Sequence, residues 1–388
     1  MTRIAFASSY PPSRSAVAMY TRNLTAAISV REIIAIYGED DPRPSPIEVH
    51  HRIRRDEADD YGRVARALRG RTDVVAIQHE FDSWGGQDGS SVLDFVRALD
   101  MPAVATLHSV PGTPRRSQRA VISELARIAA ATVVMSRSAV GVLEEVYGVD
   151  PGRIEVIPHG VPDLPFVDAE TIKPAVGLAG RDVIMSFGLL RPGKGCELVL
   201  AALPGIVASH PKTMYVVLGA THPETLRRDG EAYRESLVAM TAELGMTGHV
   251  TFVDRFVGRV ELTRWLEAAD VVLTPYRDLT LTAAGTLAYA LAAGRAVVST
   301  PFAHAVELLA DGRGVVLGSA QAGELTRAVV GLLDDPETRT AIGRRGHEHS
   351  RPMSWWHTAT AYHALFARVV ASRTRSVPLA PRQVSLGG

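Results

Sequence analysis

Cysteine is nearly absent from this sequence of 388 residues, in which Cys196 stands alone. That scarcity excludes an intramolecular disulfide framework and suits a reducing, cytoplasmic compartment. Neither sign of charge is in excess, because Lys and Arg number 42 and Asp and Glu also number 42. No overall basic field would therefore attract nucleic acid, and any anion site must be local. Apolar runs are too short to cross a membrane, and the opening "MTRIAFASSYPPSR" lacks the apolar core of a signal peptide.

Motifs of metal centres and common hydrolases are missing as well. The sequence has no Cys/His cluster with ligand spacing and no G-x-S-x-G elbow. The segment that begins with His79 and Glu80 departs from the zinc motif H-E-x-x-H, because Ser83 occupies its fifth place. We therefore expect neither a metal nor another resident cofactor. The aromatic and basic interleaving of a nucleic-acid platform is absent too.

Short apolar runs alternate with helix-like stretches along most of the chain. The runs include "RIAFAS", "DVVAIQH" and "PAVATLH" in the first half and "DVIMSFG", "MYVVLG" and "DVVLTPY" in the second. This alternation predicts an α/β protein with two doubly wound, Rossmann-like domains. A stretch rich in Pro, Asp and Gly at 162–180 marks the linker. We place the N-terminal domain at 1–168, the C-terminal domain at 169–350, a last helix at 351–373 and a disordered tail at 374–388.

One strand-to-helix junction carries a lysine between two glycines. In "FGLLRPGKGCELVL", Gly188, Gly193 and Lys194 fit the start of the P-loop pattern, but Gly195 stands where that pattern needs a magnesium-binding hydroxyl. A lysine at a helix N-terminus is unfavourable unless an anion shares the site, and glycines let phosphate approach the backbone. We predict a phosphate contact at Lys194 in a site other than an NTPase loop. The alternative is a solvated lysine in a turn.

The ordered series of segments resembles the GT-B glycosyltransferases of the retaining family four, the glycosyl transferases group 1. "GLLRPGKG" is similar to the family's G-R-L-x-P-x-K-G loop, and "AYALAAGRAVVSTP" to its "EAMAaGkPVVat" segment. The closing "MSWWHTATAYHALF" is similar to the helix that returns to the first domain. The resemblance implies transfer of a hexose from a UDP or GDP sugar to a sugar or other hydroxyl acceptor, with retention of configuration and without a metal.

On the donor side, the resemblance assigns the diphosphate to Lys194. Leu189 replaces the family's arginine, and Arg191 is the candidate substitute. His108 matches a histidine at the reaction centre, and its alternative role is to cap the following turn. His222 either faces the donor or belongs to a solvated helix face. The further donor-binding residues that we expect are Gly188, Gly193, Gly195, Ala284, Gly285, Thr286, Tyr289 and Glu307.

The acceptor is expected to enter from the first domain. Ala16 occupies a place where the family has glycine, which crowds the approach, and Arg14 either touches an anion or is solvated. His159 either faces the donor or bonds to its own turn. Arg115, with its basic neighbours on one helix, either meets anionic lipid or forms a solvated face, so we expect at most weak peripheral membrane contact. The predicted acceptor-side residues are Arg14, Ala16, His79, Glu80 and His159.

Two glutamates of the family are missing from this chain. Leu281 takes the place of the one at the donor sugar, and Tyr289 that of the one at the ribose. The predicted function is a retaining glycosyltransferase that uses a nucleotide-diphosphate hexose. The alternative is a catalytically silent GT-B homologue that binds or activates an active enzyme.

Overall fold

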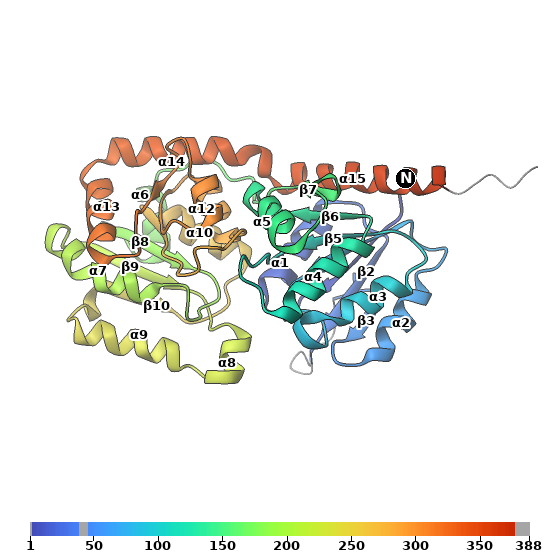
Figure 1. The fold of residues 1–388 in the computed structure, drawn as a ribbon. Coiled ribbons are helices and arrows are strands. Elements are labelled where there is room, and N and C mark those ends of the chain that lie inside the picture. The colour runs from blue at the N-terminus through green and yellow to red at the C-terminus, as the bar shows by residue number, and fades with distance from the viewer. Residues whose placement is uncertain (1, 39–45, 377–388) are drawn as a thin grey trace, which may run out of the picture.

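The computed structural model describes residues 2–38 and 46–376. These residues form two parallel sheets, each with helices on both faces (Figure 1). The strands of the first sheet lie between Ile4 and Val156, and those of the second between Asp182 and Val316. The α/β, doubly wound class predicted from the sequence is confirmed.

The first sheet has the spatial strand order β3-β2-β1-β4-β5-β6-β7. Its central strands are apolar runs buried at every position, because helices cover both faces. The strands are β1 (Ile4–Ser9), β2 (Glu32–Tyr37), β3 (His51–Arg54), β4 (Val74–His79), β5 (Ala103–Leu107), β6 (Ala131–Val134) and β7 (Ile154–Val156). The helices are α1 (Ala16–Ala27), α2 (Ala58–Ala67), α3 (Ser91–Ala98), α4 (Arg116–Ile128) and α5 (Arg137–Tyr147), with the 3-10 turns η1 (Gln87–Gly89) and η2 (Pro151–Arg153).

The second sheet has the order β10-β9-β8-β11-β12-β13. Its strands are β8 (Asp182–Phe187), β9 (Thr213–Leu218), β10 (Val250–Val253), β11 (Val271–Thr274), β12 (Ala296–Ser299) and β13 (Val315–Val316). The helices are α7 (Cys196–Ser209), α8 (Pro223–Asp229), α9 (Ala232–Glu243), α10 (Arg259–Ala268), α11 (Gly285–Ala292), α12 (Ala303–Leu308), α13 (Ala322–Asp334) and α14 (Pro336–Ser350), with the 3-10 turn η4 (Thr247–His249). In both domains the carboxyl ends of the strands form the edge where ligands bind in such sheets.

Strands β2 and β3 were not predicted from the sequence. β3 is a short, polar edge strand in which Ile53 alone is fully buried. β2 opens with a buried charge, Glu32, whose carboxylate lies 2.7 Å from the Arg71 guanidinium. The charge at the start of β2 and the polar composition of β3 both weaken the hydrophobic pattern by which strands are predicted from a sequence.

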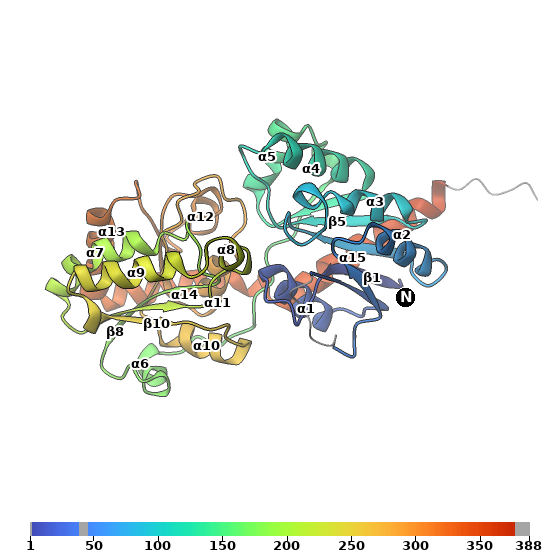
Figure 2. The same cartoon turned by 90° about the horizontal axis from the view of Figure 1, so that it is seen from below.

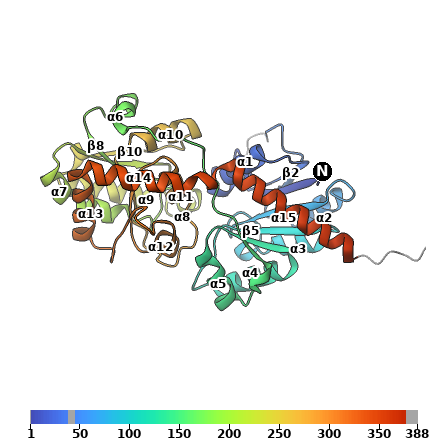
Figure 3. The same ribbon diagram turned by 90° about the horizontal axis from the view of Figure 1, so that it is seen from above.

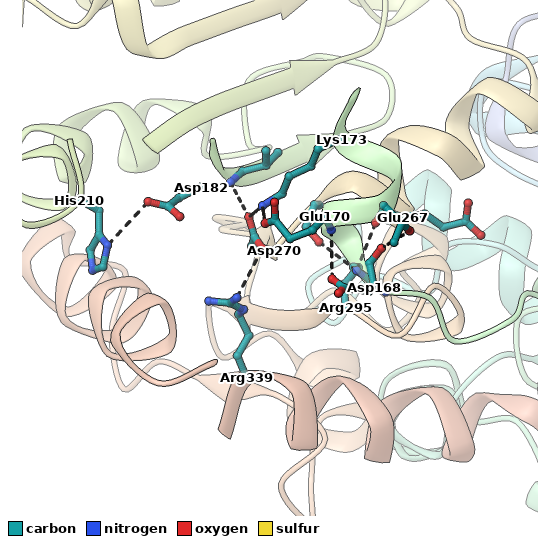
Figure 4. A network of polar contacts seen from close by, with 12 residues as sticks. Asp168, Glu170, Lys173, Asp182, His210, Glu267, Asp270, Arg295 and Arg339 are labelled. Atoms are coloured by element: carbon teal, nitrogen blue, oxygen red, sulfur yellow. Dashed lines mark hydrogen bonds and ion pairs between the residues drawn. The ribbon is translucent and has the colours of Figure 1, made fainter. Parts of the chain in front are cut away.

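A buried lysine fixes the linker to the second domain. The linker contains α6 (Ala169–Ile172) and η3 (Lys173–Val176). Lys173 is 1% exposed, and its Nζ lies 2.8 Å from Asp270 Oδ2 (Figure 4). The same carboxylate accepts a hydrogen bond of 2.7 Å from the backbone N–H of Val183 and lies 3.6 Å from Arg339. Because a buried charge is costly without partners, this cluster holds the linker against the start of β8 and β11.

The two chain crossings between the domains lie side by side. Val161 and Ser354 form a parallel bridge, and the backbone N–H of Trp355 donates to Val161 O at 3.0 Å. η5 (Arg351–Met353) precedes this point and α15 (Trp355–Ser376) follows it.

Helix α15 lies along the first domain (Figure 3). Tyr362 places its hydroxyl 2.8 Å from Thr106 Oγ1, and Phe366 packs edge-on against Phe6. The helix runs three residues beyond the predicted end at 373, because no proline or glycine interrupts it there. Residues 377–388 of the predicted tail lie outside the described residues. Among the described helices, none combines the length and the apolar character needed to span a bilayer.

Candidate functional site

The lysine of the glycine loop points at a tyrosine from the neighbouring strand end. Lys194 Nζ lies 3.0 Å from the Tyr276 hydroxyl and 4.2 Å from the centre of its ring. The Tyr276 hydroxyl in turn lies 2.5 Å from Thr286 Oγ1, in the first turn of α11. The sequence-predicted residues Lys194 and Thr286 are therefore brought together through Tyr276, a residue that was not predicted.

The glycines of this loop adopt backbone angles that favour glycine. Gly188, Gly193 and Gly195 have φ values of 111°, 93° and 71°. A Cβ on Gly195 would lie 1.8 Å from the Pro275 carbonyl oxygen, so the start of α7 can approach the end of β11 only with glycine there. Gly219, which follows β9, has the same role against Gly188, because its Cβ would lie 2.1 Å from the Gly188 oxygen.

The N-terminus of α11 faces a histidine from the first domain. A Cβ on Gly285 would lie 2.6 Å from His159 Nε2, while His159 Nδ1 is bonded at 2.8 Å to the Gly160 carbonyl oxygen. One nitrogen of His159 therefore bonds to its own turn, as one alternative predicted, while the other faces the helix start, and a contact with the donor stays a prediction. The Ala284 N–H donates to Nδ1 of the buried His304 at 3.0 Å, so this expected phosphate donor is already engaged.

His108 belongs to the same group of rings. It follows β5, and its Nε2 is 2.8 Å from Gln78 Oε1. The Tyr20 ring of α1 contacts both His108 and His159 edge-on, with centroids 4.8 and 5.1 Å away. Burial lowers the pKa of His108 to about 3 and that of His159 to about 4, so both rings are neutral near pH 7.

The His79 side chain is fully buried and so not open to an acceptor, which corrects its predicted acceptor-side position. Its side chain is 0% exposed, packs against Phe81 with ring centroids 5.4 Å apart, and bonds to no described residue. Gly89 covers it, because a Cβ there would lie 3.3 Å from His79 Nε2. Burial lowers the pKa of His79 to about 4, so the ring is a neutral core residue.

Charged side chains from the two domains face each other beside the glycine loop. Glu80 accepts a hydrogen bond of 2.6 Å from Ser109 Oγ, and burial together with the nearby Asp82 raises its pKa to about 7, against the attraction of Arg191. His222 Nε2 lies 4.0 Å from Asp82 Oδ2. Burial and then Arg191 lower the pKa of His222. Arg191 and His222 of the second domain thus meet Glu80 and Asp82 of the first.

A cavity of about 260 Å³ opens between the domains next to these charges. It lies between the β1–α1 loop and α8, which face each other in Figure 2. Arg14 lines it, and Ala16 is the exposed first residue of α1 close by. The wall includes serine hydroxyls together with basic and acidic side chains, among them Ser9, Ser83, Arg14, Arg55, Arg227, Asp82 and Glu224.

Glu307 and Tyr289 make contacts between the domains, and their predicted roles at the donor stay predictions. The Glu307 carboxylate accepts hydrogen bonds from the backbone N–H groups of Arg137 and Ser138, at 2.8 and 2.9 Å, at the start of α5. The Tyr289 hydroxyl accepts one of 3.3 Å from the Asn23 amide of α1. Both side chains have their polar groups engaged across the domain boundary.

Two family profiles match most of this chain. The profile described as Glycosyltransferase Family 4 matches residues 17–163, and the one described as Glycosyl transferases group 1 matches residues 181–335. The chain belongs to this glycosyltransferase family. Together the matches cover strands of both sheets, the glycine loop and the start of α11.

Two named relatives illustrate what this family-four chain is similar to. It is 29% identical to "D-inositol 3-phosphate glycosyltransferase 2" of Catenulispora acidiphila over 59% of this chain and 53% of the relative. It is 30% identical to a "GDP-mannose-dependent alpha-(1-6)-phosphatidylinositol monomannoside mannosyltransferase" of Mycolicibacterium smegmatis over 54% of each chain. The matches span about half the length of these relatives.

Solved structures show the GT-B fold of this family-four chain. HepE of Anabaena, solved with UDP and glucose, superposes with a TM-score of 0.76 at 14% identity, covering 95% of this chain and all of that one. Sucrose-phosphate synthase of Thermosynechococcus elongatus superposes with a TM-score of 0.80 at 16% identity, covering 96% and 100%. Within residues 2–38 and 46–376, no cluster of three or more His, Cys, Asp or Glu is arranged to hold a metal ion.

Proposed function

We propose that the chain transfers a hexose from a UDP or GDP sugar to a hydroxyl acceptor, with retention of configuration. The observation that carries this proposal is the joining of the glycine loop to the α11 start through Lys194, Tyr276 and Thr286. A cation and a helix start at the carboxyl edge of a parallel sheet form an anion site of the kind that a diphosphate fills. Family membership supports it, and so do the UDP and GDP-mannose in the names of a solved structure and a relative.

The proposed chemistry is positioning and charge stabilisation. Negative charge develops on the diphosphate as the sugar leaves, and Lys194 stabilises it with the N–H groups of Gly285 and Thr286. Arg191 belongs to the same glycine loop, three residues before Lys194, and would add a second positive charge beside the diphosphate. His108, neutral and held by Gln78, faces the sugar and orients a hydroxyl without adding charge.

A silent homologue is the second candidate, and one observation favours it. Leu281 cannot accept hydrogen bonds from a sugar, and the Tyr289 hydroxyl is already bonded to Asn23. A protein of this kind would keep the anion site and bind a nucleotide without transferring its sugar.

The binding step is tested by calorimetry of the purified full chain with UDP, GDP and ADP. We expect UDP or GDP to bind and ADP to bind more weakly. Absence of binding by UDP and by GDP, with circular dichroism showing a folded protein, would reject the proposed function. Nucleotide binding without transfer to any acceptor would favour the silent homologue.

A further inference from the structure

Two residues at the start of α12 contact both parts of the proposed anion site. Phe302 is fully buried, and its ring stacks on Tyr276 with centroids 5.2 Å apart and an interplanar angle of 20°. His304 follows two residues later, is 2% exposed, and accepts the Ala284 N–H through Nδ1 at 3.0 Å. The start of α12 therefore holds the tyrosine at the centre of the site and the residue that precedes α11.

Helix α11 begins without a side-chain cap. Its N-cap residue is Ala284, which has no side-chain oxygen to accept the N–H groups of the first turn. A serine, threonine or aspartate at this position would accept one of those groups and occupy it. The alanine therefore leaves the N–H groups of Gly285 and Thr286 free of a cap side chain, which suits a helix start that binds an anion.

A helix start without a cap needs another group to fix it. His304 supplies that group, because it bonds the N–H of Ala284 itself and not those of the first turn of α11. The α12 backbone adds two bonds, since the N–H of Ala303 donates to Leu279 O and that of His304 to Leu281 O, both at 3.0 Å. The segment before α11 is thus held at three residues by the start of α12.

The contact with Ala284 requires a neutral imidazole. A backbone N–H can bond to Nδ1 of His304 only if that nitrogen carries no proton, so the proton of the neutral ring lies on Nε2. Burial lowers the pKa of His304 to about 4, against the opposing effect of Glu307. Near pH 7 the ring is therefore neutral and accepts the Ala284 N–H, and this contact fixes its tautomer.

We propose that His304 is a positioning residue of the donor site: through Ala284 it holds the start of α11 so that the N–H groups of Gly285 and Thr286 point at the donor diphosphate. The inference rests on the proposed function, because it concerns the diphosphate site of that transfer. His304 itself does not touch the donor. Its loss should therefore lower the part of nucleotide affinity that comes from the phosphates and leave recognition of the nucleoside intact.

The test compares a nucleoside diphosphate with its nucleoside by calorimetry on the full chain, with displacement of the diphosphate where nucleoside binding is weak. The probes are UDP with uridine and GDP with guanosine, and the pair used is the one whose diphosphate binds the wild-type chain. His304→Leu removes the acceptor at similar bulk, whereas His304→Asn keeps an acceptor oxygen near the place of Nδ1. The matched control is His249→Leu, because His249 Nδ1 bonds to Thr213 O at 2.9 Å at the start of β9, away from the carboxyl edge. Urea unfolding gives the stability that each variant loses.

We expect His304→Leu to lower diphosphate affinity about tenfold and nucleoside affinity less than about twofold, because the phosphate donors are no longer aligned. His304→Asn should recover most of the diphosphate affinity, and His249→Leu should change neither affinity, although both leucine variants lose stability. Equal losses for the diphosphate and the nucleoside, or no recovery in His304→Asn, would overturn the inference. A wild-type chain that binds neither UDP nor GDP would instead reject the proposed function, and the inference with it.

A measurement on the wild-type chain covers the case in which His304→Leu does not fold. Nitrogen NMR of protein with labelled histidines reads the tautomer of each ring, and the His304 signals are those that disappear in His304→Asn. At pH 7 we expect a proton on Nε2 of His304 and none on Nδ1. A proton on Nδ1 would mean that the ring does not accept the Ala284 N–H, and it would overturn the inference.

Discussion

The Glu307 carboxylate accepts a hydrogen bond of 2.8 Å from the backbone N–H of Arg137, and this contact joins α12 of the second domain to α5 of the first. A carboxylate at a helix N-terminus satisfies free N–H groups and lies at the positive end of the helix dipole. The cap is supplied in trans, from the other domain.

Glu307→Ala should therefore destabilise the protein by about 0.5–2 kcal/mol, the usual cost of removing an N-terminal cap. Urea unfolding measures the change, with Glu243→Ala as the control because Glu243 is exposed at the end of α9. Small-angle scattering should also show a larger radius of gyration for Glu307→Ala. Equal stability of the two variants would mean that the Glu307 contact between the domains contributes nothing to the free energy of unfolding.

Lys194→Ala should weaken donor binding by about 1.5–3 kcal/mol, because a charge-assisted contact to the diphosphate is lost. Lys212→Ala removes the same charge from an exposed position before β9 and should leave donor affinity unchanged. Calorimetry with the nucleotide that binds best compares them. Unchanged affinity in Lys194→Ala would leave Lys194 as a tyrosine-stacked surface residue.

Gly285→Ala should impair both donor binding and turnover, because the new Cβ would meet His159 Nε2 at 2.6 Å. The double variant Gly285→Ala with His159→Ala should recover donor affinity, since the clash is gone. Gly331→Ala is the control, because it adds a Cβ to open space in α13 and should be neutral or stabilising. If the double variant binds no better than Gly285→Ala alone, the helix start and His159 are not in contact in solution.

Stability should rise with pH between about 4 and 6.5. Burial lowers the pKa of His79, His159 and His304 from 6.5 to about 4 and that of His108 to about 3, so the unfolded chain binds more protons in this range. Glu80 acts in the opposite sense, because its raised pKa of about 7 lets the folded state bind the extra proton above 4.5. The four histidines together change the stability more than Glu80 does, so the net free energy of unfolding should rise with pH. Urea midpoints across this range should climb with pH, and His79→Asn should flatten the slope; a fall with pH would contradict the buried neutral rings.

Much of the fold could be predicted, because buried parallel strands are apolar runs that alternate with amphipathic helices. The glycine loop was predictable for a local reason, since Lys194 and its glycines are contiguous at a strand-to-helix junction. β3 gave little signal because an edge strand needs few apolar residues. Tyr276 could not be found from its own segment, because its role depends on a lysine 82 residues away.

Some contacts of the site could not be predicted from the sequence or from the resemblance. Glu307 follows the family's spacing, but its hydrogen bonds to N–H groups of the other domain join residues 170 positions apart, and no local pattern encodes such a contact. His79 ends a strand as an active-site residue would, but the turn with Gly89 covers it. The close approach of Gly219 to Gly188 could have been predicted, because a glycine directly after a strand often marks a place where two backbone segments come close together.

The central claim is that this chain transfers a hexose from a nucleotide sugar, and a transfer assay tests it most directly. The full chain is incubated with a panel of UDP and GDP hexoses and a mixture of sugars and other hydroxyl acceptors, and released nucleotide is measured while NMR reads the anomeric configuration of the product. The account predicts acceptor-dependent release from at least one donor, retained configuration, and a marked loss in Lys194→Ala. A folded protein that releases no nucleotide and binds none of the donors, or a product of inverted configuration, would contradict it.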